Sequence, residues 1–432
     1  MFDSLSALVT ALPNSTDGLT SDALLSAITT AQELINAVTA AQLSLVAEFA
    51  HRRPAPEVPL FAGGEQSGRG DGVSEFASTE IACVLRLTRR GSDLLLGTAL
   101  ELRRLPSTAA AFGAGKLDLR RVRVITEASL DLPDEAVAEL EATVLPRAPE
   151  QTAPQLARTA RRAALRLSPR TAQERHQAIV DARSVWLEHH GGGRSRLLAE
   201  GPTHEILQLF AAVDAVARHS SSGEPDSSNA ITQRRFDALG SFARTILDDP
   251  DRSRTARGAA GITLLADPST LARLQADVPA DPQERDSPVE LLGDGPIHDA
   301  LAVELLGDPR TAVIRRTLAD DWTCDHTAGY QVPDRLARHL TGTRPRCVFP
   351  GCGVPSRRCD WDHVVPWPTG PTCACNLLPL CRYHHRLKTH TRWQLALHPD
   401  RHAAWTSPTG RTYVIHPDEE AGHHCPRGDV AV

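Results

Sequence analysis

Apolar side chains near the start of the chain recur with a helical period. They are spaced mostly four and three residues apart, at Leu24, Ile28, Ala31, Ile35, Val38, Leu45 and Phe49. Only Gln42 interrupts this row. Such spacing places apolar side chains along one face of an α-helix. Ser21 or Asp22 can cap the first turn. The pattern therefore predicts one long amphipathic helix over residues 24–49.

The same period predicts further helices, each bounded by Pro, Gly or Asp. In this half of the chain the predicted helices cover residues 75–87, 92–105, 117–128, 133–145, 153–167, 205–219 and 230–247. One β-hairpin is predicted among them, with strands at 184–188 and 195–200 flanking the glycine-rich stretch HHGGGR. Residues 54–72 are rich in Pro and Gly and are predicted to form a loop. Residues 1–250 are thus expected to form a helical domain.

The pattern is mixed beyond a charged stretch at residues 248–257, DDPDRSRTAR. A short apolar run at 261–265 predicts a strand, and LLGDGPIHDALAVELLGD predicts a turn followed by a helix over 297–306. We therefore expect a domain boundary near residue 250, a connecting region at 251–339 and a small domain at 340–415. Residues 416–432 are expected to form a disordered tail.

Composition favours a mainly α protein, because 41% of the 432 residues are hydrophobic but only 4% are aromatic. The net charge of −6 is unevenly distributed. Residues 335–411 hold twelve Arg or Lys against three acidic residues, which gives +9 and leaves −15 for the remainder. No run of eighteen apolar residues occurs, and the N-terminus lacks the basic start of a secretory signal. A cytoplasmic protein without a membrane partner is expected.

Cysteine usage indicates a metal site, since six of the nine cysteines lie between Cys347 and Cys381. Cys347 and Cys352 form one pair, Cys381 and His384 form a second, and this spacing suits a tetrahedral structural zinc. Zinc would supply folding free energy on the order of 10 kcal/mol to a small domain with little core. Three further thiols remain as alternatives that could replace His384 or recruit another ion, namely Cys359, Cys373 and Cys375.

A second set of residues suits catalysis and consists of Asp362 and His363 in WDHVVP, Asn376 in CNLL, and His385. Phosphodiester hydrolysis needs a deprotonated water and a cation near the phosphate oxygens. Asp362 and His385 could hold Mg²⁺ or Mn²⁺, and His363 could act as a general base near neutral pH. If 362–365 is a strand, however, Asp362 and His363 point to opposite faces.

This stretch resembles the HNH nuclease family, whose ββα-metal motif begins with a DH or HH pair on its first strand. The resemblance implies that Asp362 binds the catalytic metal, His363 is the base, Asn376 orients the motif and His385 is the second metal ligand. It also implies a structural zinc on Cys347, Cys352, Cys381 and His384. The segments AAFGAGKLDLRRVRVITEA, LGDGPI and WTSPTGRTY resemble actinobacterial proteins that join a domain of unknown function 222 to a C-terminal HNH domain.

The sequence therefore predicts a metal-dependent HNH endonuclease with DNA as its partner. Five basic residues are candidates for nucleic-acid contacts, namely Arg357, Arg358, Arg382, Arg386 and Lys388. The alternative is a zinc-dependent nucleic-acid-binding protein of a mobile element that no longer cleaves. RNA also remains open as a substrate. The helix at 24–49 could pair with a second copy and make a homo-oligomer, although packing within one chain explains its apolar row equally well.

Overall fold

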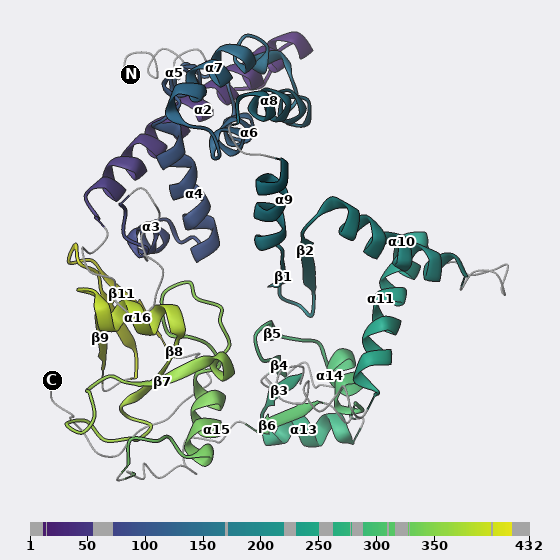
Figure 1. The fold of residues 1–432 in the computed structure, drawn as a ribbon. Coiled ribbons are helices and arrows are strands. Elements are labelled where there is room, and N and C mark those ends of the chain that lie inside the picture. The colour runs from purple at the N-terminus through teal and green to yellow at the C-terminus, as the bar shows by residue number, and fades with distance from the viewer. Residues whose placement is uncertain are drawn as a thin grey trace. The chain divides into compact units, whose positions relative to one another are not determined.

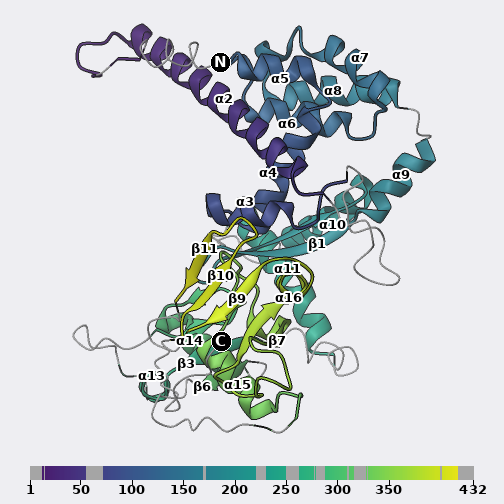
Figure 2. The same ribbon diagram turned by 90° about the vertical axis from the view of Figure 1, so that its left-hand side faces the viewer.

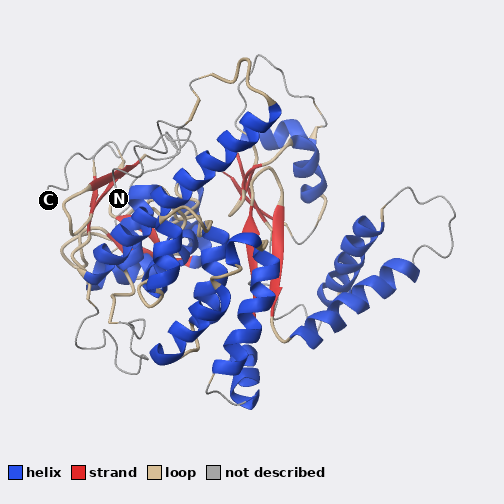
Figure 3. Cartoon of the chain, turned by 90° about the horizontal axis from the view of Figure 1, so that it is seen from above, coloured by secondary structure: helices blue, strands red, loops and turns tan. Residues whose placement is uncertain are grey.

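The computed structural model describes residues 12–13, 15–54, 72–168, 172–219, 230–249, 262–276, 278, 288–308, 311–315, 327, 329–398 and 401–416. Helices predominate among them, as the composition predicts (Figure 3). The chain divides into two compact units, Met1–Arg170 and Thr171–Val432. The boundary expected near residue 250 adjoins residues 250–261, which lie outside the described residues. Most of the predicted loop at 54–72 and all but His416 of the predicted tail at 416–432 also lie outside them. Among the described helices, none is sufficiently long and apolar to cross a bilayer.

The first unit is a bundle of helices (Figure 1). Its elements are α2 (Ser21–His51), α3 (Ala77–Leu85), α4 (Arg89–Leu102), α5 (Pro106–Gly113), α6 (Leu119–Ser129), α7 (Asp134–Val144), η1 (Ala148–Glu150) and α8 (Ala153–Leu167). Helix α2 packs against α4 and α5, while α8 packs against α6 and α7 (Figure 2). One core of buried Leu, Ile, Val, Ala and Phe side chains joins these helices, with Phe112 and Leu156 fully buried. The predicted helices of this half are confirmed, and α5 is an addition.

Helix α2 exists as predicted but buries a different face. Its buried side chains are mostly small, and they include Ala37, Ala40 and Ala47. Small side chains let neighbouring helices approach closely, which explains why this face meets the bundle. Ile28 and Leu45 of the predicted apolar row are exposed instead, at 64% and 71%. The N-cap also differs from the prediction, because the Oγ1 of Thr20, one residue before Ser21, accepts a hydrogen bond from the Ala23 N–H.

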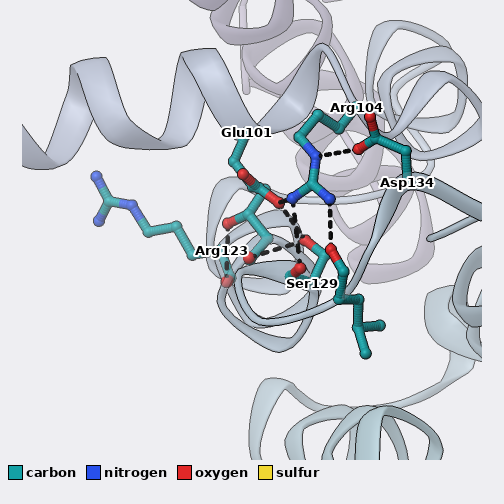
Figure 4. Close-up of polar contacts among 7 residues, drawn as sticks. Glu101, Arg104, Arg123, Ser129 and Asp134 are labelled. Carbon is teal, nitrogen blue, oxygen red and sulfur yellow. Dashed lines mark hydrogen bonds and ion pairs between the residues drawn. The ribbon is translucent and has the colours of Figure 1, made fainter. Parts of the chain in front are cut away.

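A polar cluster ties α4 to the turn between α6 and α7 (Figure 4). The Arg104 guanidinium donates to Glu101 Oε1 at 2.6 Å, to Asp134 Oδ1 at 2.8 Å and to the Leu132 carbonyl at 2.6 Å. Ser129 Oγ donates to the same Glu101 carboxylate at 2.9 Å. Arg104 thus has two carboxylate partners and two carbonyl partners, and its charge is balanced within the fold.

The second unit begins with α9 (Ala172–Asp181) and the predicted hairpin of β1 (Ser184–His189) and β2 (Ser195–Glu200). Its turn contains three successive glycines with positive φ, and two of their N–H groups donate to the Asp294 carboxylate. A side chain at these positions would strain the turn. Helices α10 (Thr203–His219) and α11 (Ile231–Leu247) follow and pack against each other through a small core.

The region expected to be connecting forms a small sheet with two helices. Its elements are β3 (Thr263–Ala266), α13 (Pro268–Gln275), β4 (Glu290–Leu291), β5 (Gly295–Pro296), α14 (Asp299–Leu306) and β6 (Ala312–Arg315). The strand order is β5-β4-β3-β6, with β3 and β6 parallel. A separate apolar core around Leu264 and Leu271 stabilises this module. The predicted strand at 261–265 and helix at 297–306 are confirmed as β3 and α14.

The C-terminal part contains two further antiparallel sheets. Its elements are α15 (Asp334–Thr343), η3 (Ser356–Arg358), β7 (Cys359–His363), β8 (Leu377–Cys381), α16 (Arg382–His390), β9 (Gln394–Leu397), β10 (Ala403–Thr406) and β11 (Thr412–Ile415). Strand β7 pairs with β8, and α16 begins directly after β8. This strand–strand–helix order is the one predicted for the stretch. The Trp405 indole on β10 is fully buried and donates to the Val348 carbonyl, which attaches the β9–β11 sheet to this unit.

Candidate metal centres

Four predicted zinc ligands meet in one buried cluster. Cys347 and Cys352 lie in the loop after α15, Cys381 ends β8, and His384 lies in the first turn of α16. One donor atom from each residue lies within 4.8 Å of the other three. Cys381 is the last residue of β8, which is buried along its whole length, and the helix that starts after it turns His384 back toward the same point. The β8–α16 junction thus supplies one half of the cluster and the preceding loop supplies the other.

The distances within the cluster fit tetrahedral zinc. His384 Nδ1 lies 3.5 Å from Cys347 Sγ and 3.2 Å from Cys381 Sγ, while Cys352 Sγ and Cys381 Sγ are 4.0 Å apart. Ligand atoms around zinc with its usual bond lengths are separated by about 3.6–3.8 Å. Three thiols and one imidazole are also the donor types that zinc prefers. The cluster could therefore hold a structural metal such as zinc.

The thiols in this cluster strongly perturb one another. Hydrogen bonds from Cys347 and Cys381, together with burial, raise the pKa of Cys352 far above its ordinary value. Hydrogen bonds from the other two thiols lower the pKa of Cys381 in turn. Three adjacent thiols cannot all ionise beside one another without a cation to offset their charge. A divalent ion would remove this conflict, because metal ligation stabilises each thiolate.

Aromatic rings enclose the histidine of the cluster. The Phe349 ring stacks on His384 with 3.9 Å between ring centroids, and Trp393 and Trp405 contact Phe349 edge-on. The three extra cysteines are not members of the four-donor cluster. The Cys359 thiol donates to the Pro355 carbonyl and also interacts with the Cys347 thiol, and Cys373 is buried in the loop before β8. These rings shield His384 from water, whereas Cys352 is partly exposed. Burial of most of the donors favours a permanently bound structural ion.

A second cluster has a different composition and lies between β7 and α16. The Oδ1 atom of Asp362 is 3.3 Å from His385 Nε2, and Asp360 Oδ2 is 2.8 Å from His385 Nδ1. Residues 360 and 362 share one face of β7 because side chains alternate along a strand. Lys388, one helical turn beyond His385, donates to Asp362 Oδ2 at 2.5 Å and to the His363 carbonyl at 2.7 Å. The predicted pair Asp362 and His385 thus lies together.

The two carboxylates of this cluster act on the protonation of His385. The hydrogen bond to Asp362 raises the pKa of His385 above its ordinary 6.5, against partial burial, and the bond to Asp360 raises it further. Asp362 Oδ1 and His385 Nε2 are spaced like two neighbouring ligands of an octahedral ion, which lie about 3 Å apart for Mg²⁺. One carboxylate oxygen and one imidazole suit Mg²⁺ or Mn²⁺. Asp362 and His385 could therefore each offer one ligand atom to such an ion, while Asp362 Oδ2 contacts Lys388.

His363 lies on the opposite face of β7, as strand alternation predicts. Its Nε2 is hydrogen-bonded to the Thr372 hydroxyl at 2.9 Å, and the Tyr330 ring stacks on it with centroids 5.4 Å apart. Only 6% of the residue is exposed. Burial lowers the pKa of His363 below 6.5, although the charge of Asp362 opposes this. The ring is thus neutral at pH 7, but it is covered by an exposed tyrosine.

Asn376 holds the loop between the two strands. Its Oδ1 accepts from the Val365 N–H at 2.8 Å, and its Nδ2 donates to the carbonyls of Val365 and Pro371. Gly370 is required within this loop, since a Cβ there would come within 2.4 Å of the Asn376 amide. These contacts fix the loop that carries Thr372, and Thr372 in turn orients His363. The side chain of Asn376 therefore orients residues of the site and is itself buried.

The candidate nucleic-acid contacts divide into two groups. Arg357, Arg358 and Arg382 are exposed, and Arg382 Nη1 lies 3.6 Å from Asp360. Arg386 and Lys388 are only partly exposed. Lys388 lies against the Asp362 carboxylate, where it balances the charge of a proposed metal ligand. Its predicted role as a phosphate contact stays a prediction, and its contacts with Asp362 and the His363 carbonyl place its charge within the site.

Sequence reasoning missed Asp360, Thr372 and Tyr330. The spacing of Asp360 two residues before Asp362 does place both on one strand face, so this signal was available. Thr372 lies in the loop between β7 and β8, and Tyr330 lies before α15. Neither stands in a pattern that indicates a site, because their contacts with His363 depend on tertiary structure.

Comparisons with known proteins place most of the chain in one family. Residues 33–341 match the family "Domain of unknown function (DUF222)". The uncharacterized protein Rv3776 of Mycobacterium tuberculosis is 30% identical over 92% of this chain and 79% of its own length. The uncharacterized protein Rv2100 of the same species is 30% identical over 94% of this chain and 80% of its own length. No solved structure matches. The chain belongs to the DUF222 family, and the metal-ligand clusters follow the segment that the family describes.

Proposed function

We propose that residues 340–415 form an HNH endonuclease domain that hydrolyses phosphodiester bonds in DNA. The observation that carries this proposal is the 3.3 Å approach of Asp362 Oδ1 to His385 Nε2 within a strand–strand–helix unit. Mg²⁺ or Mn²⁺ bound by these two atoms would withdraw charge from the phosphate and leaving oxygens. Zinc on the Cys347 cluster would hold β8 and α16 against the preceding loop.

In this proposal His363 is the general base. Its Nε2 is occupied by Thr372, which leaves Nδ1 to accept the proton of the attacking water. The lowered pKa keeps the imidazole neutral and able to accept that proton at pH 7. As the water oxygen bonds to phosphorus, the bond from phosphorus to the leaving oxygen breaks. Tyr330 covers the ring, so bound DNA must displace it.

The surrounding charges suit a phosphate substrate. Lys388 lies beside Asp362 and would stabilise charge that develops on the phosphate. Arg357, Arg358 and Arg382 are exposed near the start of β7 and of α16, where they can contact the backbone of DNA. Arg386, on the same helix, would add to this positive surface. These residues give affinity for the substrate but do not define its sequence.

A second candidate function is zinc-dependent nucleic-acid binding without cleavage. Two contacts favour it: Lys388 already neutralises Asp362, and Tyr330 already covers His363. In that case the basic face binds nucleic acid while the Asp362–His385 pair serves only the fold. The two candidates differ in one observable, because only the nuclease produces nicked or linear DNA.

The deciding experiment measures plasmid cleavage by the full chain with Mg²⁺, with Mn²⁺ and without added divalent metal. His363→Ala is compared with His204→Ala, which removes an exposed histidine on α10. Zinc content and thermal unfolding are measured on every sample. We expect metal-dependent nicking by wild type and His204→Ala, and loss of nicking in His363→Ala at unchanged zinc content. Absence of cleavage by folded, zinc-loaded wild type would favour the binding candidate.

A further inference from the structure

Helix α8 in the first unit has two faces of opposite character. Its buried side chains, Leu156, Ala160 and Ala163, recur four and three residues apart and pack into the bundle core. The opposite face holds four exposed arginines, Arg158, Arg161, Arg162 and Arg166. The helix has no acidic residue. At 1.5 Å per residue, the arginines extend over about 12 Å of helix. Helix α8 therefore presents a continuous basic surface.

Several other arginines of the first unit are paired within the fold. Arg104 donates to two carboxylates (Figure 4), and Arg121 donates to Asp118 and to the Gln151 carbonyl. Arg52 and Arg53 each pair with a glutamate. By contrast, the four guanidinium groups on α8 form no ion pair or hydrogen bond with any part of the chain that the structure describes. Their charge stabilises no described contact of the fold.

A polar hollow of about 280 Å³ opens beside the start of α8. Arg158 and Arg162 line it together with Arg147, which precedes η1. Gln155 and Thr159 add polar groups, and Glu150 is the one carboxylate in its wall. Three guanidinium groups around a polar hollow provide the planar, paired donors that bind phosphate oxygens. The hollow therefore gives the basic face a site of defined shape for a phosphate group.

We propose that this arginine face binds the sugar–phosphate backbone of duplex DNA without regard to sequence. The net charge of the whole chain is −6, so the four arginines on α8 are not part of a generally basic surface. Their concentration on one helix therefore indicates a specific polyanionic partner. The choice of DNA among polyanions rests on the proposed nuclease function. The DUF222 segment would then supply affinity for the substrate, while the C-terminal domain supplies the chemistry.

The experiment measures binding of a short fluorescent DNA duplex to the zinc-loaded full chain, without added Mg²⁺ or Mn²⁺, over a series of salt concentrations. One variant combines Arg158→Gln and Arg162→Gln, and a second adds Arg161→Gln and Arg166→Gln. Glutamine keeps helix propensity close to that of arginine. The matched control combines Arg52→Gln, directly after α2, with Arg218→Gln, on α10; both arginines are exposed and already paired. Circular dichroism checks that every variant stays folded.

We expect the four-residue variant to lose about ten-fold or more in affinity at moderate salt, because it loses contacts with phosphates. The slope of log affinity against log salt concentration should become less steep by about 0.9 for each lost contact. The two-residue variant should lose less, and the control should bind within about two-fold of wild type. Equal affinity and salt slope in the four-residue variant and in wild type would overturn the proposal. The same measurement is made with single-stranded RNA. If the four-residue variant loses more affinity for this RNA than for duplex DNA, the choice of DNA is overturned.

Failure of the nuclease proposal gives a different result. If wild type binds the duplex through α8 yet never cuts plasmid, then the DNA-binding face stands and the nuclease function fails. If wild type cuts plasmid and the four-residue variant binds and cuts equally well, then the nuclease stands and the α8 face fails.

Discussion

His384 and His385 are neighbours on α16, yet they belong to two clusters of opposite physical character. Consecutive residues on a helix point about 100° apart, so one helix can serve both sites. His384 is 4% exposed and lies among three thiols and a stacked phenylalanine. The His385 side chain is 28% exposed and lies between two carboxylates, with Lys388 one turn away. A buried sulfur-rich cluster suits a permanent structural ion, whereas an open cluster with oxygen donors suits an ion that meets substrate.

The largest expected effect follows from removing the zinc cluster. We expect the variant combining Cys352→Ser with His384→Ala to lose zinc and the folded state of residues 340–415, because structural zinc contributes about 10–16 kcal/mol in small domains. Tryptophan fluorescence reports this loss, since Trp393 and Trp405 pack around Phe349 beside the cluster. Strong chelators should produce the same change in wild type.

Cys375→Ser is the matched control for this prediction, because Cys375 lies outside the four-donor cluster. It should keep one zinc per chain and the wild-type fluorescence spectrum. Full zinc content in the variant combining Cys352→Ser with His384→Ala would contradict the assignment of these two ligands.

A smaller effect, on catalysis but not on folding, is expected at the open cluster, which consists of Asp360, Asp362, His385 and Lys388. Asp362→Asn removes the carboxylate charge from the proposed metal pair while keeping the shape of the side chain. Plasmid nicking should fall by about 100-fold or more, since loss of a group that stabilises the transition state commonly costs this much. Zinc content and circular dichroism should stay unchanged. Nicking at the wild-type rate would remove Asp362 from the proposed site. Asp134→Asn, which loses only a surface ion pair to Arg104, serves as the control.

The structural cluster and the strands and helix around it were predictable from sequence for a physical reason. Cysteine pairs at short spacing in such a segment strongly indicate metal binding. The order of two strands followed by a helix, from β7 to α16, follows from the local sequence pattern. The long helices were predictable through their period, and α8 matches its predicted range. In α2 the period located the helix but not its buried face, because small alanines meet the bundle there. Helical periodicity alone does not predict whether a helix buries its face of small side chains, which allow close packing, or its face of large apolar ones.

The open cluster was less predictable because its contacts are tertiary. The roles of Asp362 and His385 came from family resemblance, and their 3.3 Å separation depends on how α16 packs against β7. The contact of Tyr330 with His363 joins segments on either side of α15 and has no counterpart in the sequence pattern. The short strands β4 and β5 were also missed, since two residues are too few to show alternation.

The smallest expected effect, and the sharpest test of the comparison, concerns Asp360. Its Oδ2 accepts from His385 Nδ1 at 2.8 Å, which directs Nε2 of the same ring toward Asp362. Carboxylates that hold a metal-binding histidine in this way typically affect metal affinity by about 10-fold to 100-fold. Because the Asp360 side chain is 47% exposed, we expect the lower end for Asp360→Asn. The measurement is the Mn²⁺ concentration that gives half-maximal nicking.

The pH dependence of this variant separates orientation from charge. Asp362 and Asp360 raise the pKa of His385, so in wild type a proton competes with the metal for Nε2 at higher pH than for an ordinary histidine. Nicking at low Mn²⁺ should therefore rise with pH through that raised pKa. Asp360→Asn removes one of the two charges, so the midpoint should shift to lower pH. The defect of the variant should consequently be largest at alkaline pH, where only orientation matters, and shrink as the pH falls. A defect that grows as the pH falls would contradict this account and indicate that Asp360 acts on the fold of β7.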